Sequence, residues 1–229
     1  MSRLPVLLGL LLACGQDEPE PEAPRPLMVY WSAQSLKRAA QALGLGEGSC
    51  QRTMGKLDGC FLQAEHAAFG LELQHLGNTD IAGITANDWR QAGKAVKLDH
   101  NDVLGVTVFD TQRATQLGDG LTASLTRLRE LSADRLFERV KADFPAAQCT
   151  QGEHGGRQRM HCQVDDADTT GWVKLSVSPE PSPSDFDNIR VLGSWQRTQS
   201  DAELEIRLID KAASKEVLGK LLKELAGEG

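Results

Sequence analysis

The feature that most constrains this chain is a repeat of about 100 residues in the order of its local sequence patterns. Each copy opens with an apolar stripe at helical spacing: Leu36, Ala40 and Leu43 in the first, and Leu136, Val140 and Phe144 in the second. Pro145 closes the second helix. A chain built this way is expected to fold as two similar units.

A cysteine pair follows the helix in each copy, with turn-forming residues between its members. The pairs are Cys50 and Cys60, then Cys149 and Cys162. Four cysteines allow three connectivities, and an exported chain favours disulfides, so we predict that each pair closes a hairpin. A zinc site formed by Cys149, His154, His161 and Cys162 is the alternative. It matches no zinc spacing, and adjacent residues of a strand point to opposite faces, so we expect no metal.

Alternating apolar and polar residues predict strands at corresponding places in the two copies. These segments are 70–76 and 103–110, then 171–177 and 204–210. A final helix is predicted around residues 128–131 and around residues 222–225. The expected fold is α+β: two tandem helix–antiparallel sheet–helix units, 28–132 and 133–229, that arose by internal duplication. Each sheet would be covered by the helices of its own unit.

One face of each predicted sheet is polar, and Gln74, Lys174, Glu205 and Arg207 should lie on it. The interface between the units, or these polar faces, would be the site for a partner. Trp89 and Trp195 follow short apolar segments, 80–84 and 188–192, at related places in the two copies. They are the residues predicted to contact a partner. The element order resembles that of the helix-grip domains found in tandem in some envelope-assembly lipoproteins, a resemblance of order that implies no function.

The N-terminus has the features of a secretory signal: Arg3, an apolar run over residues 4–12, and a small residue, Ala13, before Cys14. The run is too short to span a bilayer. Its end resembles the lipobox of bacterial lipoproteins. That resemblance implies removal of residues 1–13, attachment of diacylglycerol to the Cys14 sulfur and acylation of its new amine, for which palmitate would serve. Two or more acyl chains would anchor the protein stably in a membrane.

Residues 14–27 combine the lipidated cysteine with a segment rich in proline and glutamate. This composition cannot build a core and predicts a disordered, extended tether. Gly15 occupies the position at which some bacteria place aspartate to retain lipoproteins in the inner membrane, which favours the outer membrane. The net charge of −7 argues against binding to nucleic acid.

Catalytic motifs do not stand out in this sequence. His100 lies among acidic residues in a predicted turn, and the acidic cluster of Asp165, Asp166 and Asp168 lacks the remainder of a calcium loop. We therefore expect no cofactor, and a non-enzymatic binding or assembly module of the envelope whose partners are membrane lipid and an envelope protein. The alternatives are a sensor or carrier with a cavity between sheet and helices, and an enzyme whose residues meet only in the fold.

Overall fold

The computed structural model describes residues 33–53, 57–74, 95–97, 103–179 and 193–225. The predicted signal peptide, Cys14, the predicted tether, Trp89 and His100 lie outside these residues. The helices are α1 (Ala33–Ala42), α3 (Thr111–Thr122), α4 (Ala133–Asp143) and α5 (Lys211–Leu225), with a short 3-10 turn η2 (Leu128–Glu130). In the described part of the chain, no helix is both long and apolar enough to cross a bilayer.

The strands of the first half are β1 (Glu47–Thr53), β2 (Leu57–Gln63), β3 (Ala67–Gln74), β4 (Ala95–Lys97) and β5 (Val103–Asp110). Those of the second half are β6 (Gln148–His154), β7 (Arg157–Asp165), β8 (Thr169–Val177), β9 (Trp195–Gln199) and β10 (Ala202–Asp210). The fold is α+β, as the sequence predicts.

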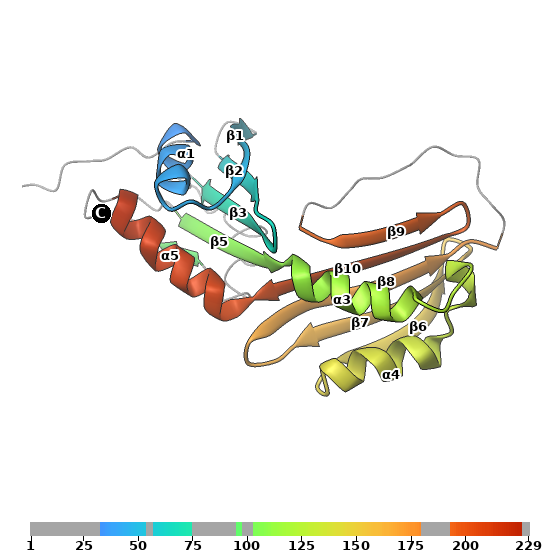
Figure 1. The fold of residues 1–229 in the computed structure, drawn as a ribbon. Coiled ribbons are helices and arrows are strands. Elements are labelled where there is room, and N and C mark those ends of the chain that lie inside the picture. Colours follow the sequence, from blue (N-terminus) through green and yellow to red (C-terminus); the bar gives the residue numbers. More distant parts are fainter. Residues whose placement is uncertain (1–32, 54–56, 75–94, 98–102, 180–192, 226–229) are drawn as a thin grey trace, which may run out of the picture. The chain divides into compact units, whose positions relative to one another are not determined.

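All ten strands belong to one antiparallel sheet (Figure 1), with the order β1-β2-β3-β5-β10-β8-β7-β6. Strand β4 pairs with β5, and β9 pairs with β10. The halves join through a short ladder in which Phe109 lies opposite Ile209 and Val108 opposite Asp210. The expectation of a separate sheet in each unit is therefore wrong. At the ends of β5 and β10, one edge of each strand has backbone groups that the other strands of its own half do not pair. These two edges pair with each other.

Corresponding strands have the same register in the two halves. In the first half, one row across the sheet runs from Cys50 through Cys60 and Leu71 to Val106. In the second half, the matching row runs from Cys149 through Cys162 and Val173 to Ile206. A shift of one residue would move every apolar side chain to the other face, so this agreement places the same pattern of side chains in both cores.

The helices that follow β5 and β10 are exchanged between the halves. Leu117 and Leu121 of α3 pack in the core of the second half, whereas Leu218 and Leu221 of α5 pack in the core of the first. Figure 1 shows α5 beside β5, and α3 beside β10. The expectation that each sheet is covered by its own unit's helices is therefore wrong for these two.

The exchange has a local cause. Asp110 is the last residue of β5, and its Oδ1 accepts a hydrogen bond from Arg113 N at 2.8 Å, which caps α3. Asp210 ends β10 and accepts from Ala213 N at 2.8 Å in the same way. Because each helix begins directly after its strand, no loop allows it to fold back over its own half, and it continues over the neighbouring half.

The final helix of the first unit also lies earlier than predicted. Helix α3 ends at Thr122, and residues 128–130 form only the 3-10 turn η2. The leucines that suggested a helix there, Leu128 and Leu131, are buried in the second core instead. Their spacing of three residues suits a single turn as well as a helix, so the local pattern could not separate the two.

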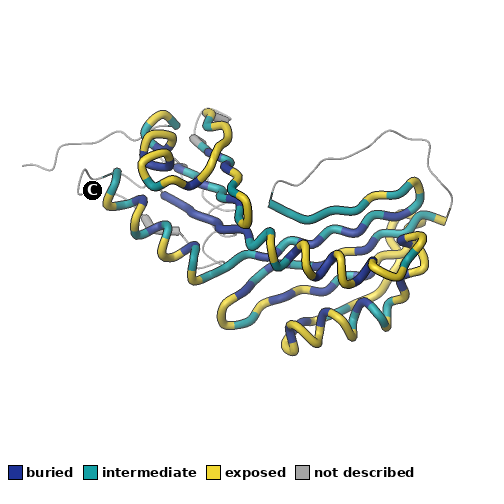
Figure 2. Tube along the Cα trace, viewed as in Figure 1, coloured by how far each residue is buried: buried dark blue, intermediate teal, exposed yellow. Residues whose placement is uncertain are grey.

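The two cores lie on the same face of the sheet. On β5 and β10 the even-numbered residues, such as Val106 and Ile206, point into the cores under the helices. Figure 2 shows the central strands buried and the outer sides of α1, α3, α4 and α5 exposed. A side chain of α5 also pairs with a backbone group of the sheet: the buried Ser214 Oγ accepts a hydrogen bond from Val108 N of β5 at 2.9 Å.

Candidate functional site

A groove of about 590 Å³ lies at the junction of the two halves, and we call it the junction groove. The first half lines it with Phe61 and Gln63 of β2, with Glu65 and His66 of the turn after β2, and with Ala68 of β3. Phe61 and Gln63 lie on the face of the sheet opposite the cores, because they alternate with the buried Cys60 and Leu62. Ala68 shares that face, because it stands opposite Gln63 in register.

Helix α3 and the start of β9 form the other walls of the junction groove. The first turns of α3 contribute Thr111, Gln112, Thr115 and Gln116. Residues 193–196 contribute Gly193, Ser194, Trp195 and Gln196. Because α3 is exchanged onto the second half, its N-terminal turns lie between β3 and β9. The groove therefore depends on the exchange.

Two glycines fix the aromatic rings next to the groove. A Cβ atom on Gly118 of α3 would lie 2.5 Å from the Trp195 ring, so only glycine lets this ring pack directly on the helix. Gly193 has a φ of +82°, and a Cβ atom there would lie 2.5 Å from the Phe109 ring. Trp195 is half-buried against the second core and also lines the groove.

The polar contacts of the groove hold its turn in place. His66 Nε2 lies 3.6 Å from Glu65 Oε1, and both side chains are exposed. The His66 carbonyl accepts a hydrogen bond from Gln112 N at 3.3 Å, which ties the turn to the start of α3. The side chains of Gln63, Gln112 and Gln116 are exposed to solvent.

A strip of alternating cations and rings crosses the polar face next to the groove. Lys174 Nζ lies 4.2 Å from the centre of the Trp172 ring, and Arg207 Cζ lies 4.7 Å from the same ring. Arg207 Cζ also lies 5.3 Å from the centre of Phe109, whose ring centre is 6.2 Å from that of Phe61. The strip links the halves at their junction, and each contact of a cation with a ring contributes roughly 0.5–1 kcal/mol at an exposed site.

A second cavity, of about 330 Å³, lies farther along the polar face of the second half. His161, Lys174 and Glu205 line it and form one row across β7, β8 and β10. Burial lowers the pKa of His161 below its ordinary value, and the neighbouring charge of Lys174 lowers it further. Burial also lowers the pKa of Arg207, which Glu205 opposes.

Two buried polar atoms lie between the cavities without a hydrogen-bond partner: Glu205 Oε1 and Gln196 Nε2. Their residues stand directly opposite each other on β10 and β9. Gln196 lines the junction groove and Glu205 lines the second cavity. The unpaired acceptor of Glu205 therefore belongs to a residue of the second cavity, and the unpaired donor of Gln196 belongs to a residue of the junction groove.

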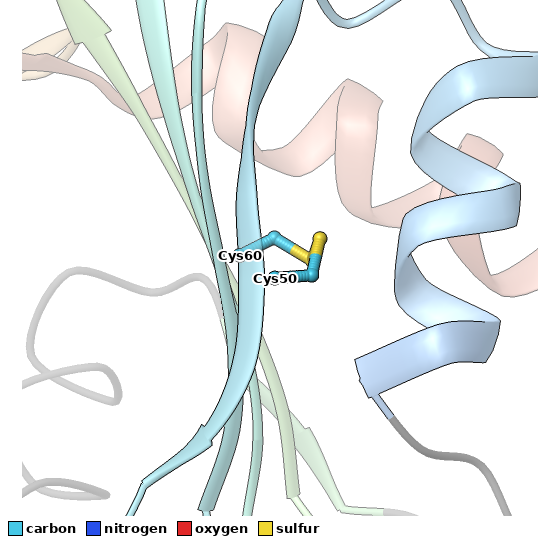
Figure 3. The surroundings of a disulfide bond; sticks show 2 residues. All are labelled: Cys50 and Cys60. Carbon is cyan, nitrogen blue, oxygen red and sulfur yellow. A yellow bond between two sulfur atoms is a disulfide. The ribbon is translucent and has the colours of Figure 1, made fainter.

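Both predicted disulfides are present, Cys50–Cys60 and Cys149–Cys162. Figure 3 shows the first bridge joining β1 and β2 on the side of the sheet that faces α1. The second bridge occupies both cysteines of the zinc alternative, and Cys162 is buried whereas His161 lies on the opposite face. Within the described residues, no group of three or more histidine, cysteine, aspartate or glutamate side chains is placed to hold a metal.

The acidic cluster considered for calcium serves a structural role. Asp166 Oδ1 accepts hydrogen bonds from Asp168 N at 3.0 Å and from Thr169 N at 2.7 Å, which closes the turn between β7 and β8. Lys211 Nζ lies 2.6 Å from Asp165 Oδ1. A lysine at the start of α5 therefore supplies a positive charge to this turn.

Some residues singled out from the sequence lie in or near this candidate site. Lys174, Glu205 and Arg207 occur on the polar face as predicted, and Trp195 lines the junction groove. The sequence analysis did not single out the other lining residues, which include Phe61, Gln112, Gln116 and the Glu65–His66 turn. They come from separate segments, and each has the local pattern of an ordinary surface residue, so only their meeting in the fold identifies them. Trp89 lies outside the described residues.

Comparisons with protein-family models, with curated proteins and with solved structures found no match to this chain.

Proposed function

We propose that this protein is a lipid-anchored, non-enzymatic binding module of the bacterial cell envelope, and that its ligand occupies the junction groove. The observation that carries the proposal is the groove itself. Its volume of about 590 Å³ is in the range of small-molecule sites. Three segments far apart in the chain line it, and sites of this kind are common where two structural units meet.

The sequence supports the cellular address. The resemblance of residues 11–14 to a lipobox supports lipid attachment at Cys14, and the following proline- and glutamate-rich segment suits a spacer. Two disulfides are typical of an oxidising compartment outside the cytoplasm. Gly15 supports the outer membrane. The partners would be membrane lipid through acylated Cys14 and a component of the envelope through the groove.

Internal duplication is the second part of the proposal. The equal strand orders and the matched rows through the two disulfides support it. Val106 and Ile206 lie 100 positions apart, as do the helix-capping residues Asp110 and Asp210. On this proposal, residues 28–132 and 133–229 are the two copies. The groove is then a site that the union of the copies created, because both of them line it.

Anchoring is tested with Cys14→Ser in a bacterial host that processes lipoproteins. We expect wild type to incorporate labelled palmitate and to sediment with membranes, and the variant to do neither. Wild-type protein recovered without acyl chains, with Cys14 as a plain thiol, would contradict the proposed address.

Binding is tested with the lipidated mature protein in detergent, incubated with purified envelope fractions: sacculi, outer-membrane vesicles and soluble periplasm. The variant Gln112→Ala/Gln116→Ala alters one wall of the groove, and Gln41→Ala changes an equally exposed glutamine of α1 as the control. We expect one fraction to retain wild type and the control but not the groove variant. Equal retention of all three proteins, or retention of none of them, would contradict the proposal.

A further inference from the structure

We propose that the ligand of the junction groove is a neutral saccharide, bound as one or a few pyranose rings against Trp195. This inference rests on the proposed function, because it names the chemical class of the groove's ligand. It follows from the chemistry of the lining side chains, from the support of the Trp195 ring and from what the described lining lacks.

The lining combines donors and acceptors in the way that hydroxyl groups require. Among the described residues it contains the side-chain amides of Gln63, Gln112, Gln116 and Gln196. Each amide offers two donors and an acceptor. A sugar hydroxyl both donates and accepts, so neighbouring hydroxyls on a ring pair well with amides. Gln196 Nε2 is a buried donor without a hydrogen-bond partner, so this wall has unused donor capacity.

The charges of the lining argue against an anionic ligand. The described lining includes no lysine or arginine, and its one carboxylate, Glu65, faces His66. Strong binding of phosphates and carboxylates uses charge-assisted hydrogen bonds from cations, and the described walls contain no lysine or arginine. A ligand without net charge suits this lining best.

The described lining also lacks the side chains that a lipid tail or an apolar peptide side chain would need. Its only aliphatic side chain is that of Ala68, and its apolar surface comes from the rings of Phe61 and Trp195. Peptides gain specificity from pockets for their side chains, and acyl chains need long apolar walls. A pyranose needs neither, because one of its faces is a compact patch of C–H groups that packs on a flat ring.

We assign Trp195 as that ring, because it lines the groove and is only partly buried. Gly118 lets one side of the indole lie directly on α3, where a Cβ atom would be 2.5 Å away. The support of the helix and of the second core holds the ring in a fixed plane, so little side-chain entropy is lost when a ligand stacks on it.

The test is calorimetric titration of the lipidated mature protein in detergent with chitotriose, cellotetraose and maltotetraose, with tetra-alanine and inorganic phosphate as the other probes. We expect at least one oligosaccharide to bind and the other two probes not to bind. Gln112→Ala/Gln116→Ala should weaken binding about tenfold or more, because it removes two amides from the wall. Gln41→Ala should leave it unchanged.

A spectroscopic reading tests the stacking separately. We expect the bound sugar to change tryptophan fluorescence in wild type. Trp195→Phe, which keeps an aromatic ring, should abolish most of that change while circular dichroism stays the same. An unchanged fluorescence response in this variant would overturn the role of Trp195.

The saccharide proposal is overturned if no oligosaccharide binds, if binding ignores the groove variant, or if tetra-alanine or phosphate binds in its place. It is also overturned if the sugar is cleaved and His66→Ala abolishes cleavage, because the groove would then be an active site. Failure here is separable from failure of the proposed function. Groove-dependent retention by an envelope fraction that no oligosaccharide competes away leaves the binding module intact and removes only the ligand class.

Discussion

At the level of single residues, His161 on the polar face has surroundings that differ from those of an ordinary surface histidine. His161 lies on β7 opposite Lys174, with Glu205 in the same row and Arg159 lining the same cavity. Its Nε2 is buried without a hydrogen-bond partner. A charged imidazole is unfavourable there, because burial and the positive charge of Lys174 both lower its pKa.

We predict a loss of stability in mild acid that depends on His161. Its pKa in the folded protein is below the ordinary value of 6.5, so the unfolded chain binds the proton first as the pH falls. The contribution to stability is complete above pH 6.5 and is lost as the pH falls from there toward the folded-state pKa. The free energy of unfolding, measured in urea at pH 7.5 and pH 5.0, should decrease less in His161→Gln than in wild type.

The exposed His154, the last residue of β6, provides the control for this measurement. His154→Gln should show the same pH dependence as wild type. If His161→Gln also follows wild type, the imidazole is not kept neutral by its surroundings.

At the level of elements, the two disulfides lie at the two ends of the sheet. Strands β1 and β6 are the ends of the sheet order, and each has a single neighbouring strand in it. Residues of β6 other than Cys149 are exposed. Each bridge ties one of these outer strands to the next strand, β2 or β7, and so limits fraying at both edges.

Removing one bridge is expected to destabilise the protein and to loosen its edge strand. For Cys149→Ala/Cys162→Ala, we predict a decrease of roughly 2–3 kcal/mol in the free energy of unfolding, because the closed loop is short. Guanidinium unfolding gives the magnitude, and hydrogen exchange should show the largest loss of protection in β6. Cys50→Ala/Cys60→Ala should have a similar effect on β1. Unchanged protection in the outer strands would show that the bridges do not hold them.

At the level of the whole molecule, the exchange of α3 and α5 makes the two halves depend on each other. Each core is completed by the helix that belongs, in sequence, to the other half. The β5–β10 ladder, the exchanged helices and the strip of Arg207 between Trp172 and Phe109 all cross the same junction. Destabilising either exchanged helix should therefore destabilise the half on which it packs.

The exchange predicts which elements lose stability when a cavity is made beneath α3 or α5. Leu121 of α3 and Leu221 of α5 are both almost fully buried and 100 positions apart, so they form a matched pair. Changing either to alanine should cost about 2–5 kcal/mol. In native-state hydrogen exchange, Leu221→Ala should lower protection mainly in β5 and α1, and Leu121→Ala mainly in β10 and β9. The opposite assignment would refute the exchange.

Local elements and covalent links could be read from the sequence. The helices through Leu36 and Leu136, the strands ending at Asp110 and Asp210, and both disulfides are present as predicted. These features depend on hydrophobic periodicity, on turn residues and on cysteines close in sequence. All of that information lies within about 15 residues of chain, so no knowledge of distant contacts is needed.

Only the tertiary structure decided how the halves combine. The apolar stripes of α3 and α5 fit either core, because the two cores present the same row of side chains, so the sequence could not assign Leu121 or Leu221 to a half. The junction groove follows from that assignment, since it brings Gln112 and Gln116 opposite Phe61 and Trp195. Periodicity specifies which face of an element is buried, whereas the choice of neighbour depends on long-range pairing at the β5–β10 edge, which no local pattern contains.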